Sequence, residues 1–285
     1  MLIELKNVSH IYEQDQKIKA LNNIDLQIKE QEFIGLIGHT GSGKSTLVQL
    51  LNGLINPSKG KVIVDGLDIT KKKENLKGIR QKVGLVFQYP EHQLFEETVH
   101  KDVAFGPSNL LLSNEEVIKR VKESIELVGL DYEKFKDRSP FNLSGGQQRK
   151  VAIAGVLAMK PQVLILDEPT AGLDPQGRKQ LIQLLQFLHE EEGITVILIS
   201  HRMEEIAQLA SRIIVMHQGE INLDGTPEEV FTRVKEIKNL SLALPEITEI
   251  LWRLKNKGLK VKTNIFTLSE AISEIAEELR RSSKC

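Results

Sequence analysis

The stretch "FIGLIGHTGSGKST" (residues 33–46) is the feature that most narrows what this 285-residue chain can fold into. Its first part, residues 33–38, is apolar nearly throughout, as expected for a strand buried on both faces of a parallel sheet. Residues 38–45 then fit G-x-x-x-x-G-K-[ST], the pattern of a glycine-rich turn that joins such a strand to a helix. An incidental lysine in a glycine-rich turn fits this context poorly. The stretch therefore predicts an α/β layered fold built around a phosphate-binding loop.

Each residue type in this phosphate-binding loop has a task in holding a nucleoside triphosphate. The glycines let backbone N–H groups curl around the β-phosphate. Lys44 can reach the β- and γ-phosphate oxygens, the Ser45 hydroxyl can bind Mg²⁺, and Thr46 can add an α-phosphate contact. The predicted contacts to nucleotide are Gly38, His39, Thr40, Gly41, Ser42, Gly43, Lys44, Ser45 and Thr46.

A second apolar run, "VLILDE" (residues 163–168), ends in two carboxylates. Asp167 would sit beside Mg²⁺ through a water, and Glu168 would face the γ-phosphate and activate a water as general base, a role typically worth ~10²–10⁴-fold in rate. The alternative is an acidic cap on the turn that Pro169 opens. Next to a phosphate-binding loop, the catalytic interpretation is favoured.

Two further apolar runs, "VGLVFQ" (residues 83–88) and "TVILIS" (residues 195–200), are also followed by polar side chains. Gln88 could contact both Mg²⁺ and the attacking water, and His201 could donate to the γ-phosphate. Alone, each is more often a helix cap or a surface residue. Together they favour a ligand site, because the carboxyl ends of parallel strands line the ligand crevice of open α/β sheets.

The remaining pattern divides the chain into parts. The ranges 2–12 and 23–30 alternate with period two, as in half-solvated antiparallel strands, and residues 212–225 resemble a hairpin that turns at Gly219. The range 90–160 has helical spacing, with "NEEVIKRVKESIELVGL" stopping at Gly129. We predict a nucleotide-binding domain over residues 1–225, with a helical subdomain at about 90–160.

Residues 232–285 are charge-rich and mostly helix-forming, so we predict a C-terminal, mainly helical extension over residues 226–285, with its boundary near Thr226-Pro227. The ranges 247–259 and 268–281 have apolar residues at helical spacing. A strand is possible at "LKVKTNIFTL" (residues 259–268). These helices could form an interface with a second subunit or could simply cap the core.

Composition excludes several classes of protein. The net charge of −1 does not favour a nucleic-acid partner. The single cysteine, Cys285, excludes an internal disulfide framework. No apolar stretch approaches the roughly 20 residues that span a bilayer. We therefore expect an intracellular protein, with any membrane role exerted through partners.

A second glycine-rich turn, "LSGGQ" (residues 143–147, the LSGGQ turn), opens an apolar helix whose free N–H groups suit an anion. With "GHTGSGKST", "FQYP", "LILDEPTAGLD" and "ISH", it resembles the ATP-binding cassette (ABC) ATPases over about residues 1–225. The resemblance implies ATP and Mg²⁺ as cofactors and two cassettes paired head to tail. It places Ser144, Gly145, Gly146 and Gln147 on the partner's nucleotide, Asp174 in the loop that links the two sites, and Tyr12 against adenine.

The segment "YPEHQLFEETVHKDVAFGP" (residues 89–107) is similar to a region of energy-coupling factor transporter ATPases, most closely the second of two ATPase subunits. That resemblance implies a groove for a coupling helix of a membrane T component. Leu94 and Phe95 could pack against this helix while Glu91, Glu96 and Glu97 meet its basic residues. Alternatively, the segment docks onto its own subdomain. In this family the C-terminal extension helps hold the two ATPases together.

The sequence thus predicts a peripheral ATPase at the cytoplasmic face of the cell membrane. It would power uptake of a vitamin or a transition-metal ion with a second ATPase, a T component and a substrate-binding S component, and no nucleic acid. The resemblance favours a paralogue as the second ATPase, and the sequence does not distinguish a paralogue from a second copy of this chain. One rival is the ATPase of another ABC transporter type. Others are a soluble nucleic-acid or ribosome-associated cassette protein and a scaffold that binds ATP without hydrolysing it. The sequence does not name the solute.

Overall fold

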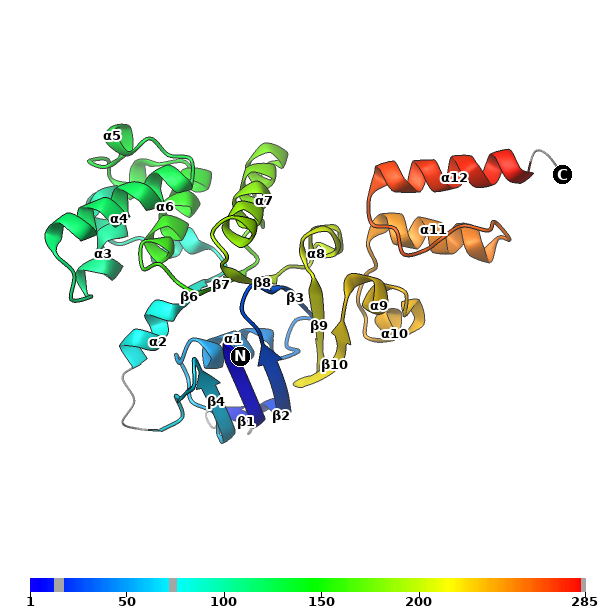
Figure 1. The fold of residues 1–285 in the computed structure, drawn as a ribbon, viewed down its shortest axis with the longest axis horizontal. Helices are drawn as coiled ribbons and strands as arrows, with labels where there is room; N and C mark the ends of the chain where they lie inside the picture. Colours follow the sequence, from blue (N-terminus) through cyan, green and yellow to red (C-terminus); the bar gives the residue numbers. More distant parts are fainter. Residues whose placement is uncertain (13–17, 72–75, 283–285) are drawn as a thin grey trace.

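Two sheets and a set of helices make up the fold, and the computed structural model describes residues 1–12, 18–71 and 76–282 (Figure 1). The strands are β1 (Ile3–Tyr12), β2 (Ile18–Ile28), β3 (Phe33–Ile37), β4 (Lys59–Val64), β5 (Leu67–Asp68), β6 (Val83–Val86), β7 (Val163–Asp167), β8 (Thr195–Ile199), β9 (Arg212–His217) and β10 (Glu220–Gly225). The helices are α1 (Lys44–Leu51), α2 (Leu76–Lys82), α3 (Val99–Ser108), α4 (Asn114–Leu127), α5 (Tyr132–Phe135), α6 (Gly145–Leu157), α7 (Pro175–Glu190), α8 (Met203–Leu209), α9 (Pro227–Phe231), α10 (Val234–Asn239), α11 (Glu246–Asn256) and α12 (Leu268–Ser282), with 3-10 turns η1 (Pro90–Gln93) and η2 (Pro140–Asn142).

The central layer is a six-stranded sheet with the order β10-β9-β3-β8-β7-β6. Strands β9, β3, β8, β7 and β6 run parallel to one another, and β10 pairs antiparallel with β9. Every residue of β3, β6 and β8 is buried, which explains their uninterrupted apolar sequences. The predicted buried strands and the hairpin at Gly219 are confirmed. Because β3, β8 and β7 are neighbours, the residues that follow them meet at one edge of the sheet.

A second sheet has four strands in the order β2-β1-β4-β5. Its strands pair antiparallel, as the alternation near the amino terminus predicts. Helix α1 lies between the two sheets. Its buried residues Leu47 and Leu50 share one core with Ile3 of β1 and Leu36 of β3. The phosphate-binding loop, directly before α1, is therefore held by packing on both sides.

The segment between β6 and β7 forms the inserted helical subdomain, drawn in green in Figure 1. Helices α3, α4 and α6 pack on one another through buried apolar side chains that include Val103, Val121 and Val151. Helix α4 begins after Ser113, whose side chain caps it. It ends just before Gly129, which takes a left-handed φ of 74°. The predicted mainly parallel sheet, antiparallel subdomain and helical insertion are confirmed.

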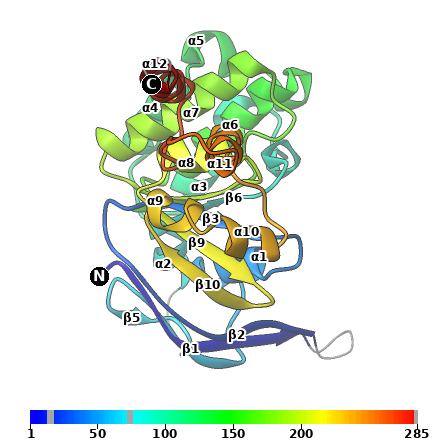
Figure 2. The same ribbon diagram turned by 90° about the vertical axis from the view of Figure 1, so that its right-hand side faces the viewer.

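Two different cores hold the C-terminal residues. Phe231 of α9 and Ile237 of α10 are fully buried in the larger core of the nucleotide-binding part. Helices α11 and α12 lie side by side around a small core of Leu251, Val261 and Ala271 (Figures 1 and 2), and Trp252 of α11 also packs against the larger core. The change in packing falls near Pro245, later than the change in composition near residues 226–227. Among the described helices, none is long and apolar enough to cross a membrane.

The possible strand at residues 259–268 is wrong, because the chain there runs without a strand beside α12. Its backbone N–H groups bond to side chains instead of to a neighbouring strand. The N–H of Lys260 donates to a Glu278 carboxylate oxygen at 2.8 Å, and that of Lys262 to a Glu274 oxygen at 2.9 Å. The alternating sequence is real, but glutamates of α12 satisfy the donors that a strand would have used.

Candidate nucleotide site

The phosphate-binding loop has a backbone that larger residues would not allow. A Cβ on Gly38 would lie 2.4 Å from the carbonyl oxygen of Met216, and one on Gly43 would lie 2.6 Å from that of Ala20. Gly43 also has a φ of 105° at the position just before α1. The loop thereby presents the free N–H groups of the first turn of α1, which suit an anion.

Lys44, the first residue of α1, is buried with its ammonium group inside the loop. Its Nζ donates to the carbonyl oxygens of Gly38 at 2.6 Å and His39 at 3.0 Å. Burial lowers the pKa of Lys44, while the nearby Asp167 and Glu168 carboxylates act in the opposite direction. A partly desolvated cation held among backbone oxygens is suited to take phosphate oxygens in exchange.

Ser45 and Asp167 come together although they lie far apart in the sequence. Asp167 ends β7, and Ser45 is the second residue of α1. The Ser45 hydroxyl donates to Asp167 Oδ2 at 3.4 Å. Burial raises the pKa of Asp167, and the Lys44 ammonium opposes that shift. A hydroxyl and a carboxylate are the hard oxygen ligands that Mg²⁺ takes in proteins, so the donor set fits this ion.

Glu168 is held in an unusual environment. Its φ of 49° is left-handed, its side chain is largely buried, and Oε1 has no hydrogen-bond partner among the described residues. Burial, and secondly the Asp167 carboxylate, raise the pKa of Glu168 to about 7. His201 Nε2 lies 3.7 Å from Glu168 Oε1. Burial, and secondly the positive charge of Lys44, lower the pKa of His201. A strained backbone and a carboxyl pKa near neutrality are typical of residues at functional sites, and such a pKa suits a general base.

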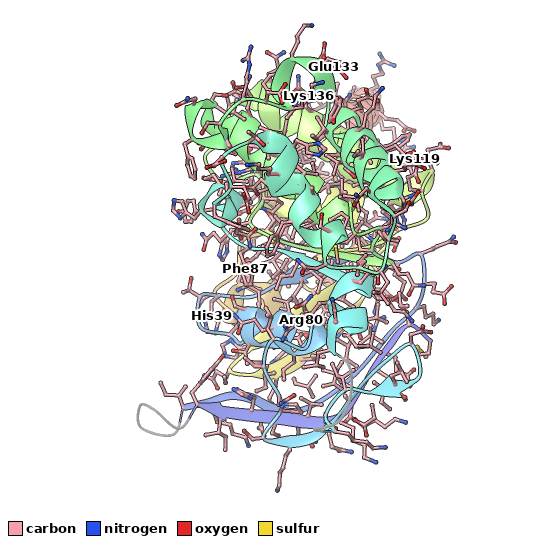
Figure 3. The ribbon with its side chains drawn as sticks, turned by 90° about the vertical axis from the view of Figure 1, so that its left-hand side faces the viewer. His39, Arg80, Phe87, Lys119, Glu133 and Lys136 are labelled. Carbon is pink, nitrogen blue, oxygen red and sulfur yellow. The ribbon has the colours of Figure 1, made fainter. Side chains whose placement is uncertain are left out.

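Gln88 lies at the same edge of the sheet. Strand β6 ends at Val86, which pairs with Leu166 of β7, so Gln88 follows β6 at the level at which Glu168 follows β7. Gln88 is exposed. Figure 3 labels its neighbour Phe87 on the same side of the molecule as His39 of the phosphate-binding loop, below the helical subdomain. The Gln88 side chain makes no hydrogen bond to the other described site residues, so its role stays a prediction.

Tyr12 lies near the start of α1. Its hydroxyl is 3.3 Å from Thr46 Oγ1, and its ring meets His10 edge-on at 4.6 Å between centroids. About 40% of Tyr12 is exposed, so the ring offers a free apolar surface. The residue is therefore close enough to the phosphate-binding loop to stack on a base, although stacking itself remains a prediction.

The LSGGQ turn is fully formed but lies on the helical subdomain. Ser144 Oγ accepts from the N–H of Gln147 at 3.4 Å, and Gln147 Oε1 accepts from the N–H of Ser144 at 3.1 Å. This capping box starts α6 and engages both side chains. Gly145 and Gly146 are exposed, and as residues of the first turn of α6 their N–H groups have no acceptor within the helix. Apart from adjacent residues and the backbone of α6, a Cβ on either glycine would find no heavy atom of the described residues within 4 Å.

The LSGGQ turn opens into a cavity of 1240 Å³ between α6 and α7. Asp174 lies on the far wall and caps α7, because its Oδ1 accepts from the N–H of Gly177 at 2.6 Å. None of the phosphate-binding loop residues lines this cavity. The predicted nucleotide contacts therefore form two separate groups in one chain: residues 38–46 with Asp167, Glu168 and His201, and residues 144–147 with Asp174.

Two buried charged residues that no sequence pattern indicates fix the turn after Glu168. Arg149 of α6 is 5% exposed and donates from Nη1 to the carbonyl oxygens of Pro169 at 2.9 Å and Ala171 at 2.6 Å. Glu205 of α8 is equally buried and accepts from Thr170 Oγ1 at 2.9 Å. Burial raises the pKa of Glu205. Both residues look like ordinary helix-surface charges in the sequence.

The expected partner surface near residues 89–107 is only partly free. Leu94 is buried in the core of its own subdomain, so its assignment to a partner helix is wrong. Glu91 pairs with Arg149, and Glu97 pairs with Lys101, so neither carboxylate is unpaired. Phe95 remains 56% exposed and meets Phe105, which is 52% exposed, edge-on. The segment therefore packs on its own subdomain, and the aromatic pair of Phe95 and Phe105 stays exposed to solvent.

The fold and the first group of residues define a P-loop nucleoside triphosphatase. The ABC transporter family matches residues 21–171. The energy-coupling factor transporter ATP-binding protein EcfA2 of Clostridium tetani is 55% identical over 277 residues, which is 96% of each chain. The protein of the same name in Clostridioides difficile is 53% identical over 288 residues, covering 100% of both chains.

Solved structures agree with these relatives. The structure of cbiO1 from Clostridium perfringens, part of the ABC transporter complex cbiONQ, is 39% identical with a TM-score of 0.72 over 86% of this chain and 96% of that one. An ATP-binding cassette solved as a dimer in a post-hydrolysis state, bound to ADP and Pi, is 34% identical with a TM-score of 0.71 over 79% and 99%. This chain belongs to the energy-coupling factor transporter ATP-binding proteins of the ABC family, as the motifs predict.

Proposed function

We propose that this ABC ATPase binds MgATP at residues 38–46 and hydrolyses it with Glu168 as the general base. One observation carries the proposal: Lys44, Ser45, Asp167, Glu168 and His201 come from three separate strand ends and meet at one edge of the sheet. The N–H groups of α1 and the Lys44 ammonium bind the phosphates. His201 donates to the γ-phosphate, and Tyr12 supports the adenine.

Ser45, Asp167 and Gln88 would hold Mg²⁺, whose charge neutralises that of the β- and γ-phosphates when the ion is bound. The close approach of Ser45 and Asp167 supports this assignment. Glu168 accepts a proton from the attacking water, which Gln88 helps to orient. Its raised pKa suits proton transfer near neutral pH.

The second group of residues acts on a nucleotide held by another chain. Ser144, Gly145, Gly146 and Gln147 would close over the ATP of a partner cassette, and Asp174 would lie where the two sites meet. Two observations support this role. Gly145 and Gly146 of the LSGGQ turn are exposed, and no described residue packs so closely that either of them has to be glycine. A γ-phosphate bridging two chains stabilises the closed pair, and hydrolysis releases it.

The names of the relatives support a transport role. The partner cassette would be a paralogue, and the pair would sit at the cytoplasmic face of the membrane on a T component, with an S component binding a vitamin or a transition-metal ion. The exposed Phe95 and Phe105 pair supports contact with a partner helix. The C-terminal helices α11 and α12 would contribute to the contact between the cassettes.

Purification of the tagged chain from membranes tests this proposal. We expect a second cassette, a T component and a small S protein to copurify, and the complex to release phosphate from ATP. Chelation of divalent ions with EDTA should stop release, and added Mg²⁺ should restore it. Recovery of a pair of classical permeases would contradict the transporter type, and phosphate release in EDTA would contradict the role of Mg²⁺.

A further inference from the structure

Arg149 joins three segments of the chain through one side chain. It lies on α6, one helical turn after Gly145 and two residues after the LSGGQ turn. Its Nε and Nη2 bond to the Glu91 carboxylate at 3.3 to 3.4 Å, and its Nη1 bonds to the Pro169 and Ala171 carbonyl oxygens. Glu91 belongs to η1, which begins just after Gln88 and Tyr89. The guanidinium therefore ties the segment after β6 and the start of α6 to the turn after β7.

The turn that Arg149 holds is the one that shapes Glu168. The N–H of Ala171 donates to the Glu168 carbonyl oxygen at 3.2 Å, and the Glu168 N–H donates to Ile199 O at 3.0 Å. The carbonyl of Ala171 is in turn fixed by Arg149 at 2.6 Å. Glu168 has a left-handed φ of 49°, a conformation that surrounding contacts must enforce. Arg149 supplies such contacts from the helical subdomain.

We propose that Arg149, oriented by Glu91, is a positioning residue that transmits the placement of the LSGGQ helix to the general base of the same chain. Binding of a partner's nucleotide at the start of α6 would then change the position of Glu168 in this chain. The proposal rests on the base role of Glu168 proposed above. It adds a specific link between the two groups of nucleotide contacts.

The chemistry of arginine suits this link. Its rigid planar fork can serve a carboxylate on one side and two carbonyl oxygens on another. Lysine keeps the charge but has one nitrogen, so it cannot span the same partners. Glu91 is the safer residue to change, because its side chain is 20% exposed and its loss leaves Arg149 bonded to the two carbonyls.

Two variants, Glu91→Gln and Arg149→Lys, test the link in the transporter complex purified from membranes. We expect kcat for ATP hydrolysis to fall between about tenfold and a hundredfold, as a misplaced catalytic group does, with KM for ATP within about twofold. The double variant should be no slower than the slower single variant, because each substitution disrupts the same connection, which runs from Glu91 through Arg149 to the turn after β7. Additive losses, or a rise in KM with unchanged kcat, would overturn the proposal.

Glu116→Gln is the matched control. Glu116 accepts from Arg120 Nε at 2.7 Å within α4 of the same subdomain, so this variant also removes a carboxylate from an arginine. We expect its kcat to stay within about twofold of wild type. An equal loss of kcat in the control would mean that any disturbed ion pair of the subdomain slows hydrolysis, which would overturn the specific role of Arg149.

A readout without turnover separates this proposal from the role of Glu168. In the nucleotide-free complex, hydrogen exchange at the Ala171 amide should be about tenfold faster in Glu91→Gln than in wild type or Glu116→Gln, because the turn opens more often. Unchanged exchange with unchanged kcat would overturn the link. If Glu168→Gln instead hydrolysed ATP normally, the base assignment would fail, while the exchange result would still report on the turn.

Discussion

The two glycine-rich turns of this protein, the phosphate-binding loop and the LSGGQ turn, look alike in sequence but are built differently. In the phosphate-binding loop, Gly38 and Gly43 are required by the fold itself, since any Cβ there would collide with a backbone carbonyl oxygen. In the LSGGQ turn, Gly145 and Gly146 have ordinary helical backbones and open space around them. Contacts within the chain determine the glycines of the phosphate-binding loop. The glycines of the LSGGQ turn have no such contacts, which leaves space there for a ligand or another chain.

Charge distinguishes the two turns as well. The phosphate-binding loop is surrounded by Lys44, Asp167 and Glu168, whose pKa values are all shifted by burial. The LSGGQ turn offers exposed N–H groups and a completed capping box. The two turns therefore lie in separate places on one chain. In the proposed function, the first is a catalytic half-site and the second a binding half-site, and a second chain would bring the complementary halves together.

The largest effect should come from Glu168→Gln, which removes the base but keeps the shape of the catalytic half-site. We expect ATP hydrolysis to fall ~10²–10⁴-fold while ATP binding persists. Phosphate release and filter binding of labelled ATP measure the two quantities. Glu192→Gln, a change at an exposed glutamate just past the carboxyl end of α7, serves as control. Turnover near the wild-type rate would remove Glu168 from the base role.

Gly145→Asp should separate the two half-sites. A carboxylate at the first position of α6 would face the partner's phosphates, and such a like-charge contact costs several kcal/mol, so hydrolysis by the complex should fall about 10²-fold. ATP binding to the isolated chain should not change, because the phosphate-binding loop lies elsewhere. Weaker ATP binding by the isolated Gly145→Asp chain would show that the LSGGQ turn serves its own nucleotide.

Replacing one glycine of each turn with alanine should affect stability unequally. Gly43→Ala places a side chain in a left-handed conformation and should lower the free energy of unfolding by about 1–3 kcal/mol or more. Gly145→Ala should leave it unchanged or raise it by up to about 1 kcal/mol, because alanine favours helix. Urea denaturation monitored by circular dichroism compares them. Equal losses of stability would contradict the open space at Gly145.

The smallest effect should come from Ser144→Ala, which removes the cap of α6. The expected loss is about 0.5–2 kcal/mol of unfolding free energy, the usual cost of a lost serine cap. Ser113→Ala at the start of α4 is a matched control, because its hydroxyl caps that helix in the same way. Hydrolysis should drop only with Ser144→Ala. A similar drop with both variants would mean that the hydroxyl of Ser144 acts only through helix stability.

The sequence predicted the elements whose signal is local. Apolar runs such as residues 163–168 are typical of buried strands, and a glycine loop after such a strand indicates a helix start. The polar residues at the strand ends could therefore be grouped at one edge of the sheet from their sequence positions alone. The LSGGQ turn was recognised by resemblance, and its openness to solvent was not predictable because it depends on what α6 packs against.

The remaining features depend on contacts between distant residues. The sequence suggests that Leu94 packs against a partner helix, yet it fills the core of its own subdomain. Residues 259–268 alternate like a strand, yet Glu274 and Glu278 take up their backbone donors. Arg149 gives no signal in the sequence, since one arginine on a helix is usually solvated and its carbonyl partners follow β7.

One photo-crosslinking measurement most directly tests whether two chains share each ATP. Phe141, which is 60% exposed and lies just before the LSGGQ turn, would be replaced by p-benzoylphenylalanine in the Glu168→Gln complex. After illumination in the presence of MgATP, mass spectrometry should find the crosslinker joined to the phosphate-binding loop of another polypeptide. If that polypeptide is a second copy of this chain, mixing isotope-labelled and unlabelled chains distinguishes a crosslink between copies from one within a copy. Crosslinks to residues 38–45 of the same polypeptide, or the same crosslinks without ATP, would contradict the shared site.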